Sequence, residues 1–432
     1  MKIDLVPFSE LLDEIVDNRG RTCPTADSGI PLIATNCIRN ETLYPVFENI
    51  RYVSQATYST WFKGHPKPGD IIFVNKGTPG RVCLVPDPVN FCVAQDMVAI
   101  RANQKKVYPK YLFAVLRSPE IQDQVEQMHV GTLIPHFKKG DFNKLLLPVH
   151  NWEIQKSIGD FYFNYSAKIE LNRRMNRTLE AMAQALFKSW FVDFDPVMAK
   201  SEGRVPFGMS AETAALFPVE LVEIDSEHFP LVPKGWKIGK VGDIGENVRR
   251  GILPDQIDPE MPYIGLEHMP RKNIALSEWG GAGDVTSNKF LFKKGEILFG
   301  KLHPYFHKVG VAAIDGVCST DILIVNPKDP EYFGVLLGHL TSVDFINYVD
   351  AGSEGTKMPR TNWEMMARYP VAIPEERIAN RFTGLVNPMV KKIHANIMEA
   401  RTLASIRDAL LPRLLSGEIR IKPKNSLTKA AQ

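Results

Sequence analysis

The run from Gln155 to Pro196 constrains this chain most, because it predicts a single long amphipathic helix. Between Phe161 and Phe194 it contains no Gly or Pro, and we expect the helix to end at Pro196. Lys168 and Asn172 interrupt its apolar pattern. Apolar residues otherwise recur at steps of four and three, as in a coiled-coil seam, at Ile154, Ile158, Phe161, Tyr165, Met175, Leu179, Met182, Leu186 and Trp190.

The same pattern returns 224 residues later in the chain. The polar interruption returns with it, since Lys168 matches Lys392 and Asn172 matches Asn396. A shared polar interruption indicates duplication more sharply than shared leucines, and buried polar residues can fix the register of two helices. Two unrelated amphipathic helices are the alternative interpretation. The apolar counterparts are Ile378, Phe382, Leu385, Met389, Leu403, Ile406, Leu410 and Leu414.

The rest of the chain also repeats in outline. Residues 1–150 predict a mixed α/β domain, with strands at 32–39, 70–77, 81–86 and 96–101 and a helix at 108–128. Three later segments resemble parts of that domain: 293–299 resembles 67–73, 321–323 resembles 96–98, and Pro359 matches Pro135. Residues 198–232 are polar and rich in Pro, which predicts an irregular connection.

We therefore expect an α+β protein in which two α/β domains alternate with two long helices. The predicted parts are 1–150 (first domain), 151–197 (central helix), 198–375 (second domain) and 376–432 (second helix with a basic tail). Packed as an antiparallel coiled coil, the helices would relate the domains by an approximate two-fold axis. Such a body suits a DNA target in two parts, because half-site spacing mirrors protein symmetry.

Composition narrows the functional class only a little. The 432 residues fit two to four domains, and no apolar run is long enough to span a membrane. The N-terminus lacks the apolar core of a signal peptide, and the five cysteines do not follow the pattern of a disulfide framework. We therefore expect a cytoplasmic protein. Net charge is +2 over 1–150, −6 over 198–375 and +7 over 376–432. Any DNA contact in the second domain must therefore be local.

The segment KIELNRRMNRTLEAMAQALFKSWFVDFDPV, together with the domain–helix–domain–helix order, resembles the specificity subunits of type I restriction-modification systems. GTLIPHFKKGDFNKLLLPV and GTKMPRTNWEMMARYPVAIPEERI resemble the two copies of that family's loop and strand before each helix. The resemblance covers essentially the whole chain. It implies two target-recognition domains that each bind one half of a bipartite double-stranded DNA target. It also implies helices that set the spacing and dock two methyltransferase subunits, with restriction (translocase/nuclease) subunits joining the complex.

We expect no catalytic residue, no metal and no cofactor in this chain. It has no G-x-x-x-x-G-K-[ST] loop and no methyl-donor fingerprint. His303, His307 and Cys318 as a metal set, and Pro86-Asp87 as part of a nuclease, are weaker interpretations than ordinary loops. Two other functions stay open: a self-contained DNA methyltransferase or nuclease, and a protein scaffold without DNA contact.

If DNA is bound, loop residues must bind it, because phosphates need cations and hydroxyls while bases need Arg, Lys, Asn or His. An ordinary surface charge is the competing interpretation for each candidate. The candidates in the first domain are Lys76, Arg81, Thr132, His136, Lys138 and Lys139. Those in the second domain are Arg249, Arg250, Lys301, His303, His307, Lys308, Thr356, Lys357, Arg360 and Asn362.

Four aromatic residues gather at the end of the central helix, more than one seam can hold: Phe187, Trp190, Phe191 and Phe194. A surplus apolar face marks a protein interface, so we expect a subunit-docking surface here. Burial against a recognition domain is the alternative.

Overall fold

The computed structural model describes residues 3–18, 20, 22–93, 95–128, 134–224, 229–353, 355 and 358–419. The chain divides into two compact units, each with mixed α and β content. Unit 1 comprises Met1–Leu171 and Thr402–Gln432, and unit 2 comprises Asn172–Arg401. No helix in the described part of the chain is both long and apolar enough to cross a membrane.

Unit 1 contains three small sheets with the strand orders β2-β8-β5-β6, β4-β3-β7 and β1-β9. Its strands are β1 (Asp4–Pro7), β2 (Leu12–Val16), β3 (Ile30–Ile33), β4 (Arg51–Val53), β5 (Ile71–Val74), β6 (Val82–Leu84), β7 (Cys92–Val93), β8 (Met97–Ala102) and β9 (Leu146–Val149). Its short helices are η1 (Phe8–Leu11), η2 (Thr35–Cys37), α1 (Gln55–Thr60), α2 (Pro109–Leu116), α3 (Pro119–Met128) and η3 (Lys139–Asp141).

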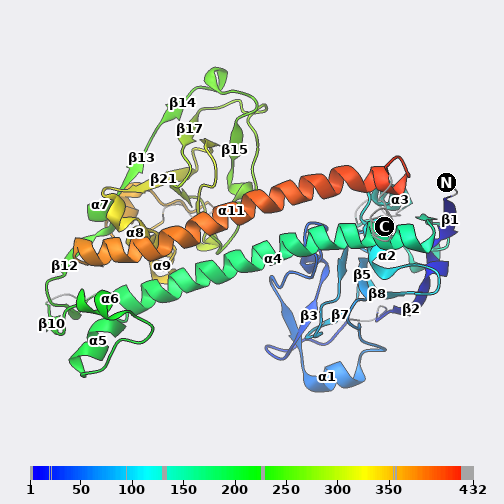
Figure 1. Ribbon diagram of the computed structural model, residues 1–432, viewed down its shortest axis with the longest axis horizontal. Coiled ribbons are helices and arrows are strands. Elements are labelled where there is room, and N and C mark those ends of the chain that lie inside the picture. Colours follow the sequence, from blue (N-terminus) through cyan, green and yellow to red (C-terminus); the bar gives the residue numbers. More distant parts are fainter. Residues whose placement is uncertain are drawn as a thin grey trace, which may run out of the picture. The chain divides into compact units, whose positions relative to one another are not determined.

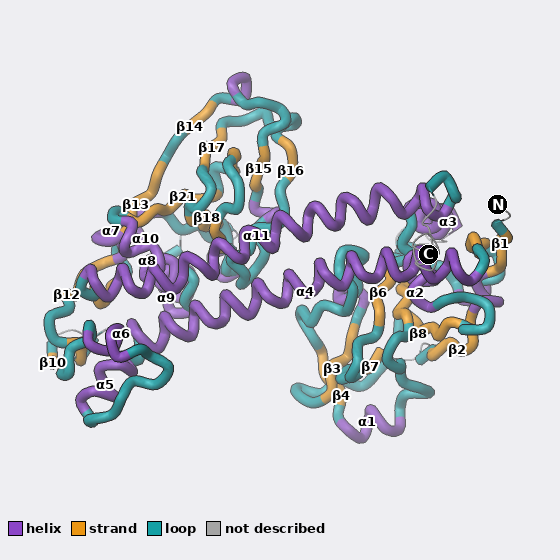
Figure 2. The backbone as a smooth tube through the Cα atoms, in the orientation of Figure 1, coloured by secondary structure: helices purple, strands orange, loops and turns teal. Residues whose placement is uncertain are grey.

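Unit 2 contains sheets of order β13-β21-β18-β19, β14-β17-β20-β15-β16, β12-β22 and β10-β11 (Figures 1 and 2). Its strands are β10 (Leu221–Glu223), β11 (Leu231–Pro233), β12 (Lys237–Lys240), β13 (Gly245–Val248), β14 (Gly251–Ile252), β15 (Pro262–Ile264), β16 (Gly280–Gly281), β17 (Lys289–Phe292), β18 (Ile297–Gly300), β19 (Val309–Val311), β20 (Gly316–Cys318), β21 (Ile322–Pro327) and β22 (Pro370–Ile373). Its short helices are α5 (Asp195–Ser201), α6 (Ala211–Ala215), α7 (Val241–Ile244), η4 (Pro254–Gln256), η5 (Leu266–His268), η6 (Pro304–Phe306), η7 (Pro330–Tyr332), α8 (Phe333–Leu340), α9 (Val343–Ala351) and α10 (Trp363–Ala367).

The two units repeat one topology. The antiparallel order β2-β8-β5-β6 in unit 1 corresponds to β13-β21-β18-β19 in unit 2. The central pair keeps its register, with Ile71 opposite Ile100 in one unit and Ile297 opposite Val325 in the other. A parallel pair follows in each, β3 with β7 and β15 with β20. The sequence repeat therefore corresponds to a repeat of strand order and pairing.

Each unit also contains part of both long helices, α4 (Trp152–Phe191) and α11 (Glu376–Leu415). In unit 1, Arg407 donates to the Ser166 hydroxyl at 3.1 Å, and His150 lies 2.9 Å from the Leu415 carbonyl. Residue numbers rise along α4 as they fall along α11, so the helices run antiparallel in this unit.

In unit 2 the same direction holds. Asn172 donates to the Asn396 carbonyl at 3.4 Å, and Phe191 meets Phe382 edge-on with ring centroids 4.8 Å apart. Asn396 in turn donates to the side chain of Asn176 at 2.8 Å. The asparagines of the predicted polar interruption, Asn172 and Asn396, are therefore buried between the two helices and hydrogen-bond across them. Its lysines are not buried, since Lys168 is half-buried and Lys392 is exposed.

The predicted apolar seam is only partly correct. Ile158 and Trp190 are buried, but Met182 is 49% exposed and its counterpart Ile406 is 38% exposed. Near the middle of α4 most buried positions are polar, namely Ser166, Glu170, Asn172, Asn176 and Glu180, and Ile169 is the apolar residue buried among them. Hydrogen bonding rather than apolar burial thus dominates the middle of this helix.

Two predicted boundaries are wrong for local reasons. The helix predicted at 108–128 is broken into α2 and α3, because Pro119 cannot continue the first and instead begins the second. The long helix ends at Phe191 rather than at Pro196. Phe194 adopts a left-handed conformation with φ 53°, and Pro196 lies in the first turn of α5. The connection predicted at 198–232 also contains α6 and β10.

In both units a short helix packs closely against a long helix through a glycine. The glycine lies on the long helix in unit 1 and on the short helix in unit 2. In unit 1, a Cβ on Gly159 of α4 would lie 2.6 Å from the Tyr111 nitrogen of α2. In unit 2 the glycine is on the short helix instead: Gly334 of α8 donates its N–H to Thr383 of α11 at 2.9 Å. Position 383 is 224 residues after 159, so the two units use the same contact with opposite partners.

Glu180 of α4 is a buried carboxylate held by a backbone donor. Its Oε1 accepts the Ile274 N–H at 3.0 Å and the Gln184 amide at 3.4 Å. Burial, opposed by the Ile274 N–H, raises the pKa of Glu180 to about 7. The ordinary value is 4.5, so between these two pH values the folded chain holds a proton that the unfolded chain has released.

We expect the free energy of unfolding to fall as the pH rises from about 4.5 to about 7, because Glu180 ionises in the unfolded chain before it ionises in the folded chain. Glu180→Gln should remove this loss. One pKa unit corresponds to about 1.4 kcal/mol, so the variant should exceed the parent by about 3 kcal/mol at pH 8 and match it near pH 4.5. Urea unfolding at both pH values measures this. Glu153→Gln, the same change at an exposed position of α4, should show no such difference. A Glu180→Gln variant no more stable than the parent at pH 8 contradicts the account.

Candidate nucleic-acid interface

In unit 1 the loop that follows β5 is joined to the segment 135–137. Lys76 and His136 form an isolated antiparallel bridge. Gly77 donates its N–H to the Pro135 carbonyl at 2.9 Å, and Phe137 donates to Asn75 at 2.8 Å. Two predicted site residues that are distant in sequence therefore become neighbours.

In unit 2 the loop that follows β18 uses the same scheme. Leu302 and Arg360 form the bridge, and position 360 is 224 residues after 136. His303 donates to the Pro359 carbonyl at 2.8 Å, as Gly77 does to Pro135, and Thr361 donates to Lys301 at 3.0 Å. The backbone framework is the same in both units, while the side chains that it carries differ.

An aspartate supports this loop in each unit. The Asp96 carbonyl accepts the N–H groups of Asn75 at 2.8 Å and Lys76 at 3.1 Å, and the Asp321 carbonyl accepts that of Lys301 at 2.9 Å. The Asp96 carboxylate lies 4.0 Å from the Lys76 ammonium, and the Asp321 carboxylate lies 3.4 Å from the Arg360 guanidinium. Each aspartate thus lies close to one cation of its bridge, Lys76 in unit 1 and Arg360 in unit 2.

An open hollow of about 510 Å³ adjoins the bridge in unit 2. Four of the predicted site residues line it, and they contribute three cationic groups and one amide. Asn362 also caps α10, because its side chain accepts the Met365 N–H at 2.8 Å. The lining residues are Arg249, Lys301, Leu323, Gly355, Arg360, Thr361, Asn362 and Trp363.

The other predicted residues of unit 1 are mostly exposed. Arg81 and Lys138 are exposed, and Lys139, 43% exposed, lies 3.6 Å from the Asp17 carboxylate. His136 is half-buried. Thr132 lies outside the described residues. These positions allow solvent-facing cations beside the bridge, and their role in binding stays a prediction.

Three predicted residues of unit 2 are committed to the protein itself. His307 is 8% exposed, and burial, reinforced by Lys272, lowers its pKa, so the expectation that it contacts DNA is wrong. Lys308 is half-buried and donates to the Leu266 carbonyl at 2.5 Å. Arg250 donates to the carboxylate of Glu296 and to the Leu291 carbonyl. Burial and internal pairing cannot be read from the one-dimensional pattern. Thr356 and Lys357 lie outside the described residues.

His303 follows the bridge residue Leu302 and adopts a left-handed conformation with φ 52°. It is half-buried, and its Nδ1 lies 3.1 Å from the hydroxyl of Tyr305, which is 50% exposed. Nearby, the Arg271 guanidinium stacks over the Phe306 ring at 3.7 Å.

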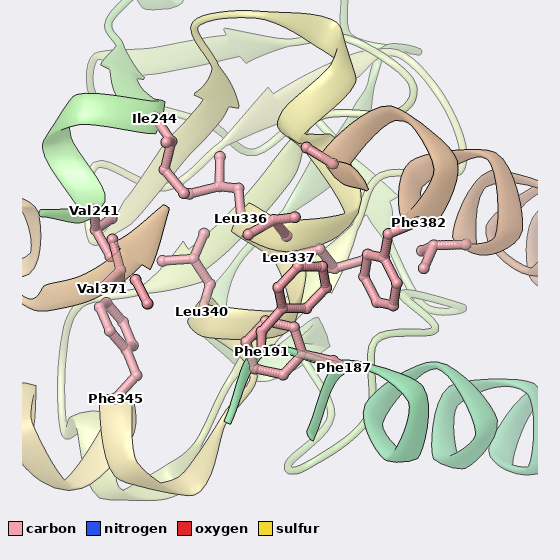
Figure 3. Close-up of a cluster of buried hydrophobic side chains, with 14 of the residues drawn as sticks. Phe187, Phe191, Val241, Ile244, Leu336, Leu337, Leu340, Phe345, Val371 and Phe382 are labelled. Atoms are coloured by element: carbon pink, nitrogen blue, oxygen red, sulfur yellow. The ribbon is translucent and has the colours of Figure 1, made fainter. Parts of the chain in front are cut away.

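The four aromatics expected to form a docking surface are core residues. Phe187, Trp190, Phe191 and Phe194 are between 1% and 7% exposed. In unit 2 they pack with Phe382 of α11 and with α8, as Figure 3 shows for Phe187, Phe191, Leu337 and Phe382. The expectation of an exposed docking surface is therefore corrected. The surplus of aromatic residues is explained by burial within unit 2.

Some residues at this site were not singled out from the sequence. Asp96 and Asp321 were noted only as matching positions, and Trp363 only as part of a repeated segment. The available signal was an aspartate at the same place before a strand in both repeats. No three His, Cys, Asp or Glu side chains gather as a metal site within the part of the chain that the structure describes, so His303, His307 and Cys318 form no such set there.

Residues 14–181 match the family model described as the Type I restriction modification DNA specificity domain. The chain is 28% identical over 403 residues to the Type I restriction enzyme HindI specificity subunit of Haemophilus influenzae, covering 82% of this chain and 87% of that one. It is 23% identical to the MjaIX specificity subunit of Methanocaldococcus jannaschii, covering 82% and 78%.

Among solved structures, the fold is similar to the crystal structure of a Type-I restriction-modification system S subunit from M. genitalium. The TM-score is 0.55 at 16% identity, and 96% of each chain is covered. At this identity the likeness concerns the fold alone.

Proposed function

We infer that this chain is the DNA specificity subunit of a type I restriction-modification system. The observation that carries this conclusion is the match to such subunits over most of the chain, with a DNA specificity domain at residues 14–181. The chain binds DNA as one component of that complex. Because it binds DNA, we place it in the cytoplasm.

We propose that each unit binds one half of a bipartite target. The repeated bridge supports this, because one backbone framework presents Lys76 with His136 in unit 1 and Leu302 with Arg360 in unit 2. Different side chains on the same framework suit two different half-sites. The domains proposed for this task are residues 1–150 and 198–375.

We propose further that α4 and α11 form an antiparallel coiled coil with approximate two-fold symmetry, which sets the distance between the half-sites. The antiparallel contacts within each unit support this arrangement. In this proposal the chain is non-catalytic, two methyltransferase subunits dock along the helices, and restriction subunits complete the assembly. Met182 and Ile406, which are exposed on these helices, are better docking candidates than the buried aromatics.

A methylation assay tests whether this chain supplies sequence recognition while a partner subunit supplies methylation. The chain alone should methylate no DNA, and it should direct methylation to a defined sequence once a methyltransferase partner is added. Methylation by the purified chain would instead identify a self-contained enzyme. If the partnered chain bound random duplex and target duplex equally in a gel shift, or neither of them, it would be a protein scaffold.

The exposed lysines next to the unit 1 bridge should bind phosphates. Lys138→Ala with Lys139→Ala should weaken binding to target and random duplexes by the same factor, because phosphate contacts carry no sequence information. Each lost contact should also reduce the slope of log K against log salt by about 0.9, so by about 2 for the pair. Equilibrium binding of the partnered chain at several salt concentrations measures both effects.

The matched control is Lys105→Ala with Lys106→Ala. These lysines follow the far end of β8 from Asp96, and the pair removes the same charge. The control should leave the slope near that of the parent. Equal effects of the two double variants would show general electrostatic attraction rather than contact at this loop.

A further inference from the structure

We propose that the residue pair at each bridge selects a base pair, and that in unit 2 Arg360 binds a guanine while Asp321 acts as its positioning residue. This inference rests on the proposed DNA-binding function. It names the residues that determine the specificity of the site.

Arg360 is placed as a base-reading side chain must be. Its side chain is 54% exposed, and it borders the hollow that Arg249, Lys301 and Trp363 also line. The bridge with Leu302 fixes its backbone. A guanidinium carries five N–H donors in a rigid fork, and a bidentate contact of this fork with guanine O6 and N7 is the commonest specific contact in the major groove.

Asp321 distinguishes a base contact from a phosphate contact. Its carboxylate lies 3.4 Å from one terminal nitrogen of Arg360, which leaves the other donors of the fork available. The Asp321 backbone is held in place, because its N–H donates to the Ser319 hydroxyl at 3.2 Å and its carbonyl accepts the Lys301 N–H. A carboxylate beside the guanidinium repels a phosphodiester but not a neutral base edge. The pair therefore favours the base.

Unit 1 also has an aspartate beside a cation of its bridge, but this cation is on the other strand of the bridge. Asp96 corresponds to Asp321, but its partner Lys76 occupies the position of Leu302, and His136 occupies that of Arg360. An ammonium and an imidazole replace the guanidinium fork, so we infer that the two units select differently at the corresponding base pair. An Arg–Leu pair and a Lys–His pair offer different donors to the groove.

The test uses the full chain with its methyltransferase partner, on the target that methylation mapping defines. Each guanine of that target is replaced in turn by 7-deazaguanine, which removes the N7 acceptor. The parent should lose about tenfold to a hundredfold in affinity at one guanine. Arg360→Gln should already have lost this factor on the natural target, and it should be insensitive to the replacement. Arg360→Lys should keep its affinity for random duplex yet discriminate less.

The variant Asp321→Asn tests whether Asp321 positions Arg360 or only stabilises the fold. Removing a negative charge should leave binding to random duplex equal or tighter, while the ratio of target to random affinity falls. A merely structural role would lower both. The control for Arg360→Gln is Arg368→Gln, which removes the same positive charge at another exposed arginine of unit 2 and should alter the response to no single guanine.

Three results overturn the inference alone. Arg360→Gln weakens target and random duplexes equally, its dependence on each guanine matches that of the parent, or the mapped target contains no guanine. If the parent itself shows no preference for any sequence, the proposed function fails as well.

Discussion

Phe191→Ala should destabilise unit 2 by about 3–5 kcal/mol, the range for truncating a large buried aromatic. Phe191 is 1% exposed, and its ring lies 4.8 Å from Phe382 and 5.7 Å from Trp236. Truncation removes contacts to α11 and to the residue just before β12, so it leaves a cavity where helix and sheet meet (Figure 3).

Thermal and urea unfolding of the purified chain measure this loss. Phe207→Ala is the matched control, because it makes the same truncation at a fully exposed position of the same unit. The control should stay within about 0.5 kcal/mol of the parent. Comparable losses in the two variants would show that Phe191 is not a core residue, and the docking interpretation of the aromatics would have to be reopened.

Exchanging residues 1–150 for the corresponding domain of a relative should replace one half of the DNA target and leave the other half and the spacing unchanged. Different halves follow from different bridge residues, whereas the spacing is proposed to depend on α4 and α11. We expect at least a thousandfold change in preference between the old and new half-sites, within the range by which specific exceeds non-specific DNA binding.

The graft must preserve one interface within unit 1. Tyr111 and Leu112 share a core with Ile158 of α4 and Leu411 of α11. A donor domain with apolar residues at the first two positions should therefore be chosen, and unfolding should be checked before specificity. Methylation mapping in cells carrying the chimera gives the result. An unchanged target, or a change in both halves, would contradict independent reading.

The parts of the fold that could be predicted were those with local or periodic signals. The match of Pro135 with Pro359, 224 residues later, corresponds to the same hydrogen bond in both units, since each carbonyl accepts the N–H of the loop residue after the bridge. The predicted break at Asn172 and Asn396 also lies where the helices meet. These features follow from side-chain pattern and spacing, which the sequence displays directly.

The parts that could not be predicted depend on tertiary contacts. The exposed Met182 satisfied the apolar period, but the middle of α4 buries Asn176 and Glu180 instead. His307 has the composition of a contact residue, yet it is buried by its surroundings. The single helix predicted at 108–128 runs through Pro119, which instead begins α3. Which cations face solvent depends on partners such as Glu296, which pairs with Arg250.

The most direct measurement is a map of methylated positions in DNA from cells with the intact system and from cells that lack only this chain. The account predicts two short defined sequences separated by a fixed gap of unspecified bases, and it predicts loss of this methylation without the chain. Methylation that persists without the chain, or a single uninterrupted target, would contradict the view that this protein supplies two separate determinants of DNA specificity.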